Sequence, residues 1–144
     1  MSAIFLLACS SALQAAEEEH GYEEDILAVF IGGARDHRDN GPALGLEYEH
    51  RFTANFGLGA LVEHTFGSFN TWVFAFPLAY HEGPWKLYAG PGLEKHKGES
   101  TAMVRLGVEY GFHFENWEIA PQVDFDFVGD EKVFVLGVTF ARGF

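Results

Sequence analysis

The chain has 144 residues, of which 48% are apolar and 16% aromatic, and its formal net charge is −12 at pH 7. This length favours a single domain, and the acidic excess argues against a nucleic-acid partner, because binding to phosphates needs a basic surface. No apolar run is long enough for a membrane-spanning helix, whereas abundant glycine and aromatic residues in short alternating segments are typical of a β-barrel.

Residues 1–15 form an uncharged, mainly apolar segment. This composition predicts the core and cleavage region of a secretory signal peptide, so we expect the chain to be exported. The single cysteine, Cys9, follows Leu6-Leu7-Ala8, which loosely resembles a lipoprotein cleavage box. Cleavage after Ala15 or Ala16 is the favoured alternative and would remove Cys9. We expect residues 16–23 to form a flexible acidic lead-in and residues 24–144 the folded domain.

Eight segments follow in which side chains alternate with a period of two, and this period predicts β-strands with unlike faces. One face carries large apolar side chains and the other small or polar ones, although the first segment alternates too poorly for its faces to be assigned. Short turn-forming segments separate the predicted strands, which span residues 24–34, 43–52, 56–66, 72–80, 85–94, 102–114, 117–127 and 133–144.

Three prolines, Pro77, Pro91 and Pro121, lie inside predicted strands. Each removes one backbone donor from the sheet, so we expect bulges or other irregular pairing close to them. Gly90-Pro91-Gly92 is the segment at which we expect a strand to end early.

The alternation fits two opposite arrangements. In a soluble barrel the apolar row faces inward, whereas in an outer-membrane barrel it contacts lipid and the polar row fills the lumen. Three features favour the membrane arrangement. The predicted strands are long enough to cross a bilayer at a tilt, the other row combines small residues with scattered charges, and aromatic residues flank the turns at one end like an interfacial belt. This predicted aromatic belt consists of Phe52, Phe56, Tyr80, Trp85, Phe114, Trp117 and Phe144.

The segment 24–144 resembles the family of small eight-stranded bacterial outer-membrane β-barrels typified by OmpA and OmpX. The resemblance rests on the number of strands, the spacing of the turns and the final Phe144 with Phe140 before it, although Arg142 stands where the family usually has another aromatic residue. It implies an all-β, eight-stranded antiparallel up-and-down transmembrane barrel in the bacterial outer membrane. It also implies contact with outer-membrane lipids and with the barrel-assembly machinery through the C-terminal strand. The loops are shorter than the family's long outer loops, and we expect a monomer.

The polar row contains more acids than bases. The two-residue turn at 115–116 sets a register that places Arg105 opposite Asp126, His113 opposite Glu118 and Glu109 opposite Gln122. An eight-stranded lumen is just wide enough for side chains, so a filled polar core is favoured over a narrow cation-preferring conduit. The predicted lumen network consists of Glu47, Glu49, Arg51, Glu63, Lys86, Glu94, Arg105, Glu109, Glu118, Asp124 and Asp126.

Two further groups of residues invite a chemical interpretation. Lipid A acyltransferases and deacylases are small outer-membrane barrels that use a histidine and a serine near the membrane rim. His64 and Ser68 are the comparable pair here, with only the adjacent Glu63 as a companion acid. Asp36-His37-Arg38-Asp39 offers ligands for a divalent ion, but its arginine favours a solvated loop. We therefore predict no catalytic, cofactor-binding or metal-binding residues.

These observations favour a non-enzymatic, integral outer-membrane β-barrel with a structural role in the envelope or with narrow, cation-preferring permeation. The alternative is a soluble exported barrel of the lipocalin type, in which the phenylalanine-rich row faces inward around an apolar ligand.

Overall fold

The computed structural model describes residues 24–144, and the predicted signal peptide and lead-in lie outside the described residues. In the described part of the chain no helix is long and apolar enough to cross a membrane. The strands are β1 (Asp25–Arg35), β2 (Asn40–Arg51), β3 (Phe56–Thr65), β4 (Thr71–Ala75), β5 (Leu78–Glu82), β6 (Trp85–His96), β7 (Glu99–Tyr110), β8 (Phe112–Phe114), β9 (Trp117–Val128) and β10 (Glu131–Gly143).

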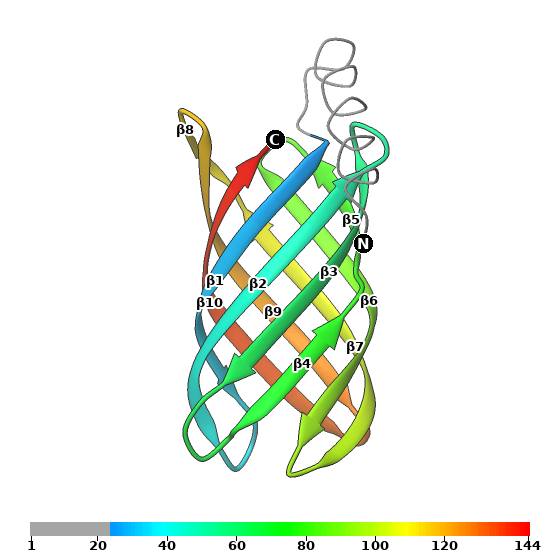
Figure 1. Ribbon diagram of the computed structural model, residues 1–144, viewed down its shortest axis with the longest axis vertical. Coiled ribbons are helices and arrows are strands. Elements are labelled where there is room, and N and C mark those ends of the chain that lie inside the picture. The colour runs from blue at the N-terminus through cyan, green and yellow to red at the C-terminus, as the bar shows by residue number, and fades with distance from the viewer. Residues whose placement is uncertain (1–23) are drawn as a thin grey trace, which may run out of the picture.

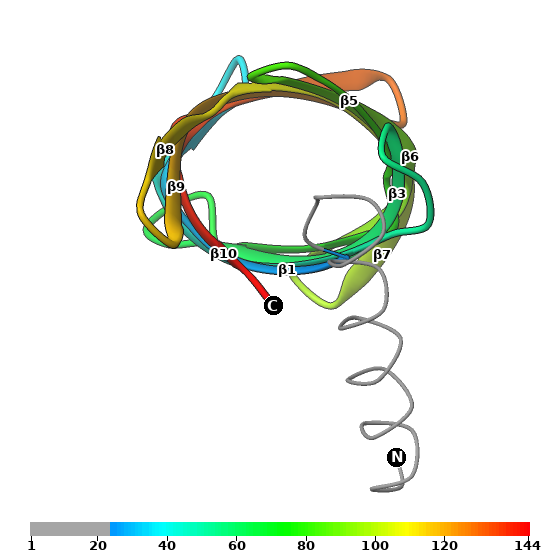
Figure 2. The same ribbon diagram turned by 90° about the horizontal axis from the view of Figure 1, so that it is seen from above.

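These strands form one closed antiparallel barrel (Figures 1 and 2). β4 and β5 are consecutive parts of one wall strand, since both pair with β3 and β6. β7 and β8 are likewise parts of one wall strand, since both pair with β9. The ten strands therefore make an eight-stranded wall. β10 returns to pair with β1 over the register Ile26 opposite Gly143 to Arg35 opposite Phe134. The predicted eight-stranded up-and-down barrel, closed by its last strand, is therefore confirmed.

The three prolines disturb the wall less than expected. Only Pro77 coincides with a break, between β4 and β5, and even there Gly59 N donates to Pro77 O (2.8 Å) and Phe76 N to Pro91 O (2.9 Å). Pro91 and Pro121 lie within continuous strands, opposite Val104 and Val138. The expected early end at Gly90-Pro91-Gly92 is thus wrong. A proline removes its own donor, but its carbonyl still accepts a bond and the register passes through unchanged.

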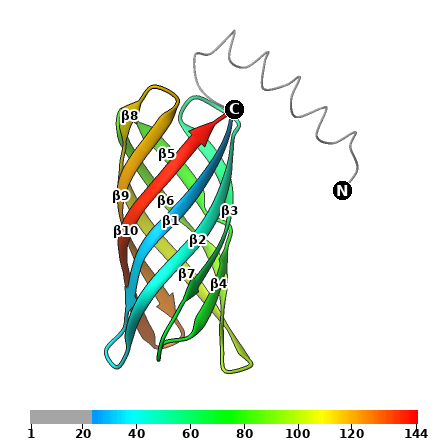
Figure 3. The ribbon, with the colours of Figure 1, turned by 60° about the vertical axis from the view of Figure 1, so that its left-hand side comes forward.

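The connections at both ends of the barrel are short (Figure 3). We call the end that holds Asp25 and Phe144 the terminal rim; its turns span 52–55, 83–84 and 115–116. The opposite end, the distal rim, has turns at 36–39, 66–70, 97–98 and 129–130. Several strands extend further into these turns than predicted. β6 and β7, for example, are joined by Lys97 and Gly98 alone, whose positive φ angles of 52° and 80° suit a two-residue hairpin turn.

The large apolar side chains point outward around the whole barrel. Phe76 is 58% exposed and Leu58 54%, and the outward row of the poorly alternating β1 is Leu27, Val29 and Ile31. The phenylalanine-rich row therefore does not surround a ligand, and the lipocalin-like alternative is wrong on this point. Soluble monomers rarely expose an apolar surface of this extent to water.

The interior is divided into an apolar part and a polar part. The apolar part reaches the distal rim and comprises Phe30, Ala34, Ala43, Leu61, Phe69, Val73, Ala75, Met103, Val128, Val133 and Val135. Phe30 fills space left by two facing glycines, Gly32 on β1 and Gly137 on β10, since a Cβ on either would lie 2.6 or 2.5 Å from its ring. The polar part occupies the middle of the barrel and the side of the terminal rim.

Candidate functional site: the polar interior and its mouths

Arg105 is the central cation of the interior and is fully buried. Its Nε and Nη2 atoms donate to the two oxygens of Asp126 at 2.6 and 2.7 Å. Nη1 and Nη2 donate to the two oxygens of Glu63, both at 3.1 Å. One guanidinium thus makes two bidentate contacts, with β9 on one side and β3 on the other, and such charge-assisted pairs are strong and orientationally specific.

A second set of bonds extends this network towards β6 and β10. Asp124 accepts hydrogen bonds from the Tyr88 hydroxyl and from Gln122 Nε2, the latter at 2.6 Å. The Thr139 hydroxyl donates to Gln122. Asp124 also lies 3.5 Å from Arg105, so buried polar contacts connect β3, β6, β7, β9 and β10 across the lumen.

Lys86 is the cation of a separate cluster nearer the terminal rim. Its Nζ lies 2.8 Å from Glu47, 2.8 Å from Glu49 and 3.2 Å from Glu109. His81 Nε2 contacts the other oxygen of Glu49 at 2.5 Å. Three carboxylates therefore share one lysine, His81 contacts one of the three, and a cavity of only ≈20 Å³ adjoins them.

The eleven residues of the predicted lumen network fall into two groups. Glu47, Glu49, Glu63, Arg105, Glu109, Asp124 and Asp126 are buried, and Lys86 joins them through the contacts given above. Arg51 and Glu118 line the mouth at the terminal rim and Glu94 the mouth at the distal rim. The register prediction is confirmed for all three pairs, Arg105 with Asp126, Glu109 with Gln122 and His113 with Glu118.

Four participants were missing from the predicted network. Tyr88, Gln122 and Thr139 occupy inward positions of the same alternation, so a search for any polar residue on that row would have found them. His81 was assigned to a turn, but β5 extends through it to Glu82 and turns its ring into the lumen.

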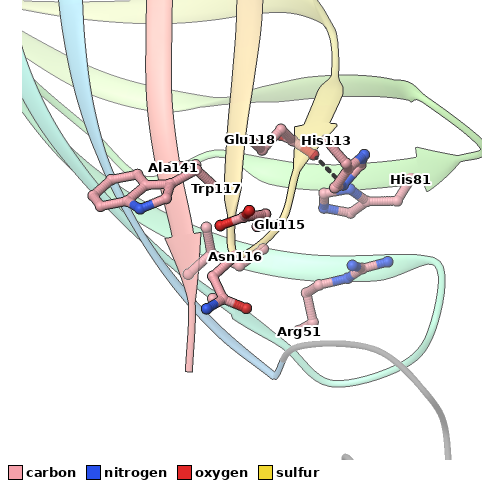
Figure 4. Close-up of a pocket in the computed structure, with 10 residues that line it drawn as sticks. Arg51, His81, His113, Glu115, Asn116, Trp117, Glu118 and Ala141 are labelled. Atoms are coloured by element: carbon pink, nitrogen blue, oxygen red, sulfur yellow. Dashed lines mark ion pairs between the residues drawn. The ribbon is translucent and has the colours of Figure 1, made fainter.

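The two mouths are shallow polar cups. Figure 4 shows the cup at the terminal rim, a cavity of ≈130 Å³ in which His113 Nε2 pairs with Glu118 at 2.8 Å and His81 lies close by. The cup at the distal rim, ≈160 Å³, is lined by Asp36, Arg38, Asp39, Phe69, Thr71, Glu94, His96 and Glu131. The Arg105 network and the apolar cluster lie between these mouths, so side chains occupy the lumen in this structure.

The seven residues of the predicted aromatic belt flank the terminal-rim turns or end the chain there, all on the outer side of the wall. Phe56 packs against Tyr80 with ring centroids 5.2 Å apart, and Trp85 against Tyr110 at 4.9 Å. Arg142, the exception in the terminal apolar row, lies over the Trp117 ring at 5.6 Å from its centroid. Amphipathic rings and a long basic side chain at one level suit a membrane interface.

The residues considered for catalysis or metal binding do not form such sites. His64 packs on the outer face between Phe66 and Trp72, with centroids 4.4 and 4.3 Å away, whereas its neighbour Glu63 points inward to Arg105. Glu63 therefore cannot orient His64. Asp36 accepts the backbone N–H groups of Arg38 and Asp39 at 2.7 and 2.6 Å and so shapes its own turn. Within residues 24–144 no group of three or more histidine, cysteine, aspartate or glutamate side chains is arranged to hold a metal ion.

No protein-family model matches the sequence, and no curated protein is significantly similar to it. Solved structures do match. The N-terminal β-barrel domain of Pseudomonas aeruginosa OprF is 17% identical with a TM-score of 0.60, covering 83% of this chain and 98% of that one. A de novo designed transmembrane β-barrel is 13% identical with a TM-score of 0.58 (83% and 97%). Ail, the attachment invasion locus protein of Yersinia pestis, is 13% identical with a TM-score of 0.52 (85% and 100%). The chain therefore has the fold of the small eight-stranded outer-membrane β-barrels.

Proposed function

We propose that this protein is an integral outer-membrane β-barrel with a structural role in the bacterial envelope and a lumen closed by its own side chains. In this proposal the outward apolar row contacts lipid, the protein is a monomer without enzymatic activity, and its C-terminal strand is the element that the barrel-assembly machinery engages.

The inverted distribution of polarity carries this proposal. Charged side chains such as Arg105 and Asp124 are fully buried, while the large apolar side chains are exposed along every strand. A protein in water buries its apolar side chains and exposes its charged ones. A barrel in a bilayer is expected to do the reverse. The side chains that fill the lumen support a structural role, because Arg105 is fully buried and bridges the middle of the barrel from β9 to β3.

Cell fractionation tests the location. We expect the full chain in the detergent-soluble outer-membrane fraction, with β-sheet circular dichroism and a monomeric mass only when detergent or lipid is present. Removal of residues 1–15 should leave the protein in the cytoplasm. A β-rich monomer that stays soluble without detergent would contradict the proposal.

One observation favours permeation as a second candidate. Among residues 24–144, six buried inward carboxylates (Glu47, Glu49, Glu63, Glu109, Asp124 and Asp126) share the two cations Lys86 and Arg105, and such an excess of negative charge would attract cations. Planar-bilayer conductance in KCl separates the candidates. Silence at all voltages fits the closed structural barrel, whereas cation-selective steps that disappear when the acids are neutralised would establish a conduit.

A further inference from the structure

A small cleft on the outer face, near the terminal rim, combines an exposed carboxylate with aromatic side chains. Two adjacent cross-strand pairs line it, Glu82 opposite Trp85 and Tyr80 opposite Leu87, beside the turn that joins β5 to β6. The cavity measures ≈210 Å³, room for roughly seven water molecules at about 30 Å³ each. We call it the Glu82 cleft.

Glu82 gives the cleft a negative charge. It is exposed on the same face as the belt residues Tyr80 and Trp85, and its carboxylate accepts a hydrogen bond from the Tyr80 hydroxyl at 3.2 Å. The neighbouring bases do not neutralise it, because His81 and Lys86 point into the lumen, where they contact Glu49. No cation among residues 24–144 forms an ion pair with Glu82, so this exposed carboxylate is available to a cation from outside the barrel.

The walls of the cleft are aromatic, and each packs against an aromatic ring on a neighbouring strand. Trp85 meets Tyr110 edge to face at 84°, and Tyr80 packs against Phe56 with ring centroids 5.2 Å apart. These contacts restrict both rings before any ligand arrives, which lowers the entropic cost of binding. Aromatic faces around a carboxylate form a recognition pattern for ammonium groups, through cation–π attraction and direct charge pairing.

We propose that the Glu82 cleft binds the primary ammonium of an ethanolamine phospholipid head group, an inference that rests on the proposed membrane location. The ammonium lies at Glu82 between the rings of Tyr80 and Trp85, and the apolar side chain of Leu87, one pair further from the rim, contacts the lipid beyond the head group. A primary ammonium is favoured over a quaternary one because its N–H groups donate to the carboxylate, which trimethylammonium cannot do.

Native mass spectrometry of the full chain, released from bilayers of equal parts phosphatidylethanolamine, phosphatidylcholine and phosphatidylglycerol, tests this assignment. We expect phosphatidylethanolamine to be enriched roughly fivefold among the retained lipids, in line with about 1 kcal/mol for one cation–π and charge contact. Glu82→Gln and Trp85→Leu should each abolish most of the enrichment. Glu115→Gln is the matched control, because it makes the same charge change on the same rim, in the lining of the mouth rather than the cleft.

The other outcomes are informative in different ways. Equal retention of all lipids by a correctly inserted barrel, or enrichment that persists in Glu82→Gln, overturns the cleft assignment and leaves the proposed function intact. Preferential retention of phosphatidylcholine overturns the assignment to a primary ammonium. Failure of the wild-type chain to insert into bilayers contradicts the proposed function itself. Circular dichroism of each variant in the same bilayers shows whether it has folded.

Discussion

Arg105 and Asp126 lie directly opposite one another on β7 and β9, and two hydrogen bonds of 2.6 and 2.7 Å join them inside the barrel. The same guanidinium reaches across the lumen to Glu63 on β3, so it links wall segments that are far apart in the sequence. Arg105 is therefore a central cross-link of the filled interior.

Arg105→Met should destabilise the barrel by about 3–5 kcal/mol, because it leaves buried carboxylates without their counter-ion. Urea unfolding from lipid vesicles, followed by tryptophan fluorescence, measures this loss. Combining the change with Glu63→Gln and Asp126→Asn should recover at least about half of it, since the stranded charges are then removed. Arg142→Met is the control for loss of an arginine on the outer face. An equal loss in that variant would contradict a special role for Arg105.

Gly107 marks the closest approach between the wall and the network. A Cβ at this position would lie 2.1 Å from the Tyr88 ring and 2.2 Å from Asp124. Gly107→Ala should therefore displace both side chains and cost about 1–3 kcal/mol, as overpacking of a core usually does. Gly33→Ala, where the nearest atom is the Gly41 carbonyl oxygen at 3.4 Å, should be close to neutral in the same unfolding assay. Similar losses of stability in the two variants would show that the lack of space beside Tyr88 and Asp124 is not the reason for a glycine at position 107.

The contact of the outward row with lipid can be tested by placing a charge at different depths in the bilayer. Leu106 lies near the middle of β7 and is 42% exposed, whereas Phe114 ends β8 at the terminal rim. Leu106→Lys should cost about 2–4 kcal/mol in a bilayer and Phe114→Lys no more than about 1 kcal/mol, because the penalty for a charge falls towards the interface. Vesicle unfolding compares them directly. Equal penalties would mean that this face does not lie across the hydrocarbon.

Asp25 joins the beginning of the barrel to its end. Its carboxylate accepts the Tyr48 hydroxyl and lies 3.0 Å from His50 Nδ1, while its backbone exchanges hydrogen bonds with Phe144 at 3.3 and 2.8 Å. Asp25→Ala should speed amide hydrogen exchange at Phe144 and lower stability by about 0.5–1.5 kcal/mol, the usual net contribution of a hydrogen bond, because Tyr48 and His50 are partly exposed. Asp130→Ala, in a distal turn, should leave exchange at Phe144 unchanged. If amide exchange at Phe144 is unaltered in Asp25→Ala, the Asp25 carboxylate does not stabilise the pairing of β1 with β10.

The sequence predicts the class of fold well because a period of two repeats through nearly every strand, and lipid tolerates only one assignment of the two rows. It predicts the Arg105 pair for the same reason, since a two-residue turn at 115–116 leaves one register. The prediction of strand ends fails where a neighbouring strand compensates for a missing backbone donor. Pro91 keeps its place in β6 because its carbonyl still accepts from Phe76, and a single strand's sequence does not show that bond.

Contacts across the lumen were also beyond the reach of the sequence. The approach of Glu63 to Arg105, and of Glu47 and Glu49 to Lys86, depends on how far the strands tilt around the axis. Tilt and stagger are properties of the closed barrel as a whole. Alternation shows which side chains point inward, but it does not show which of them meet.

The closure of β10 on β1 has a consequence for the order of folding. Every other pairing joins consecutive segments through turns of a few residues, so these hairpins form with little loss of chain entropy. The pairing of Ile26 with Gly143 instead brings together the two ends of the domain. Because such non-local contacts slow folding, we expect this seam to form last, with φ-values near zero for truncations of the paired residues Ile31 and Val138 and higher values in the hairpins. Until then β1 and β10 are open sheet edges, and the time spent in that state sets how long the chain is exposed to aggregation.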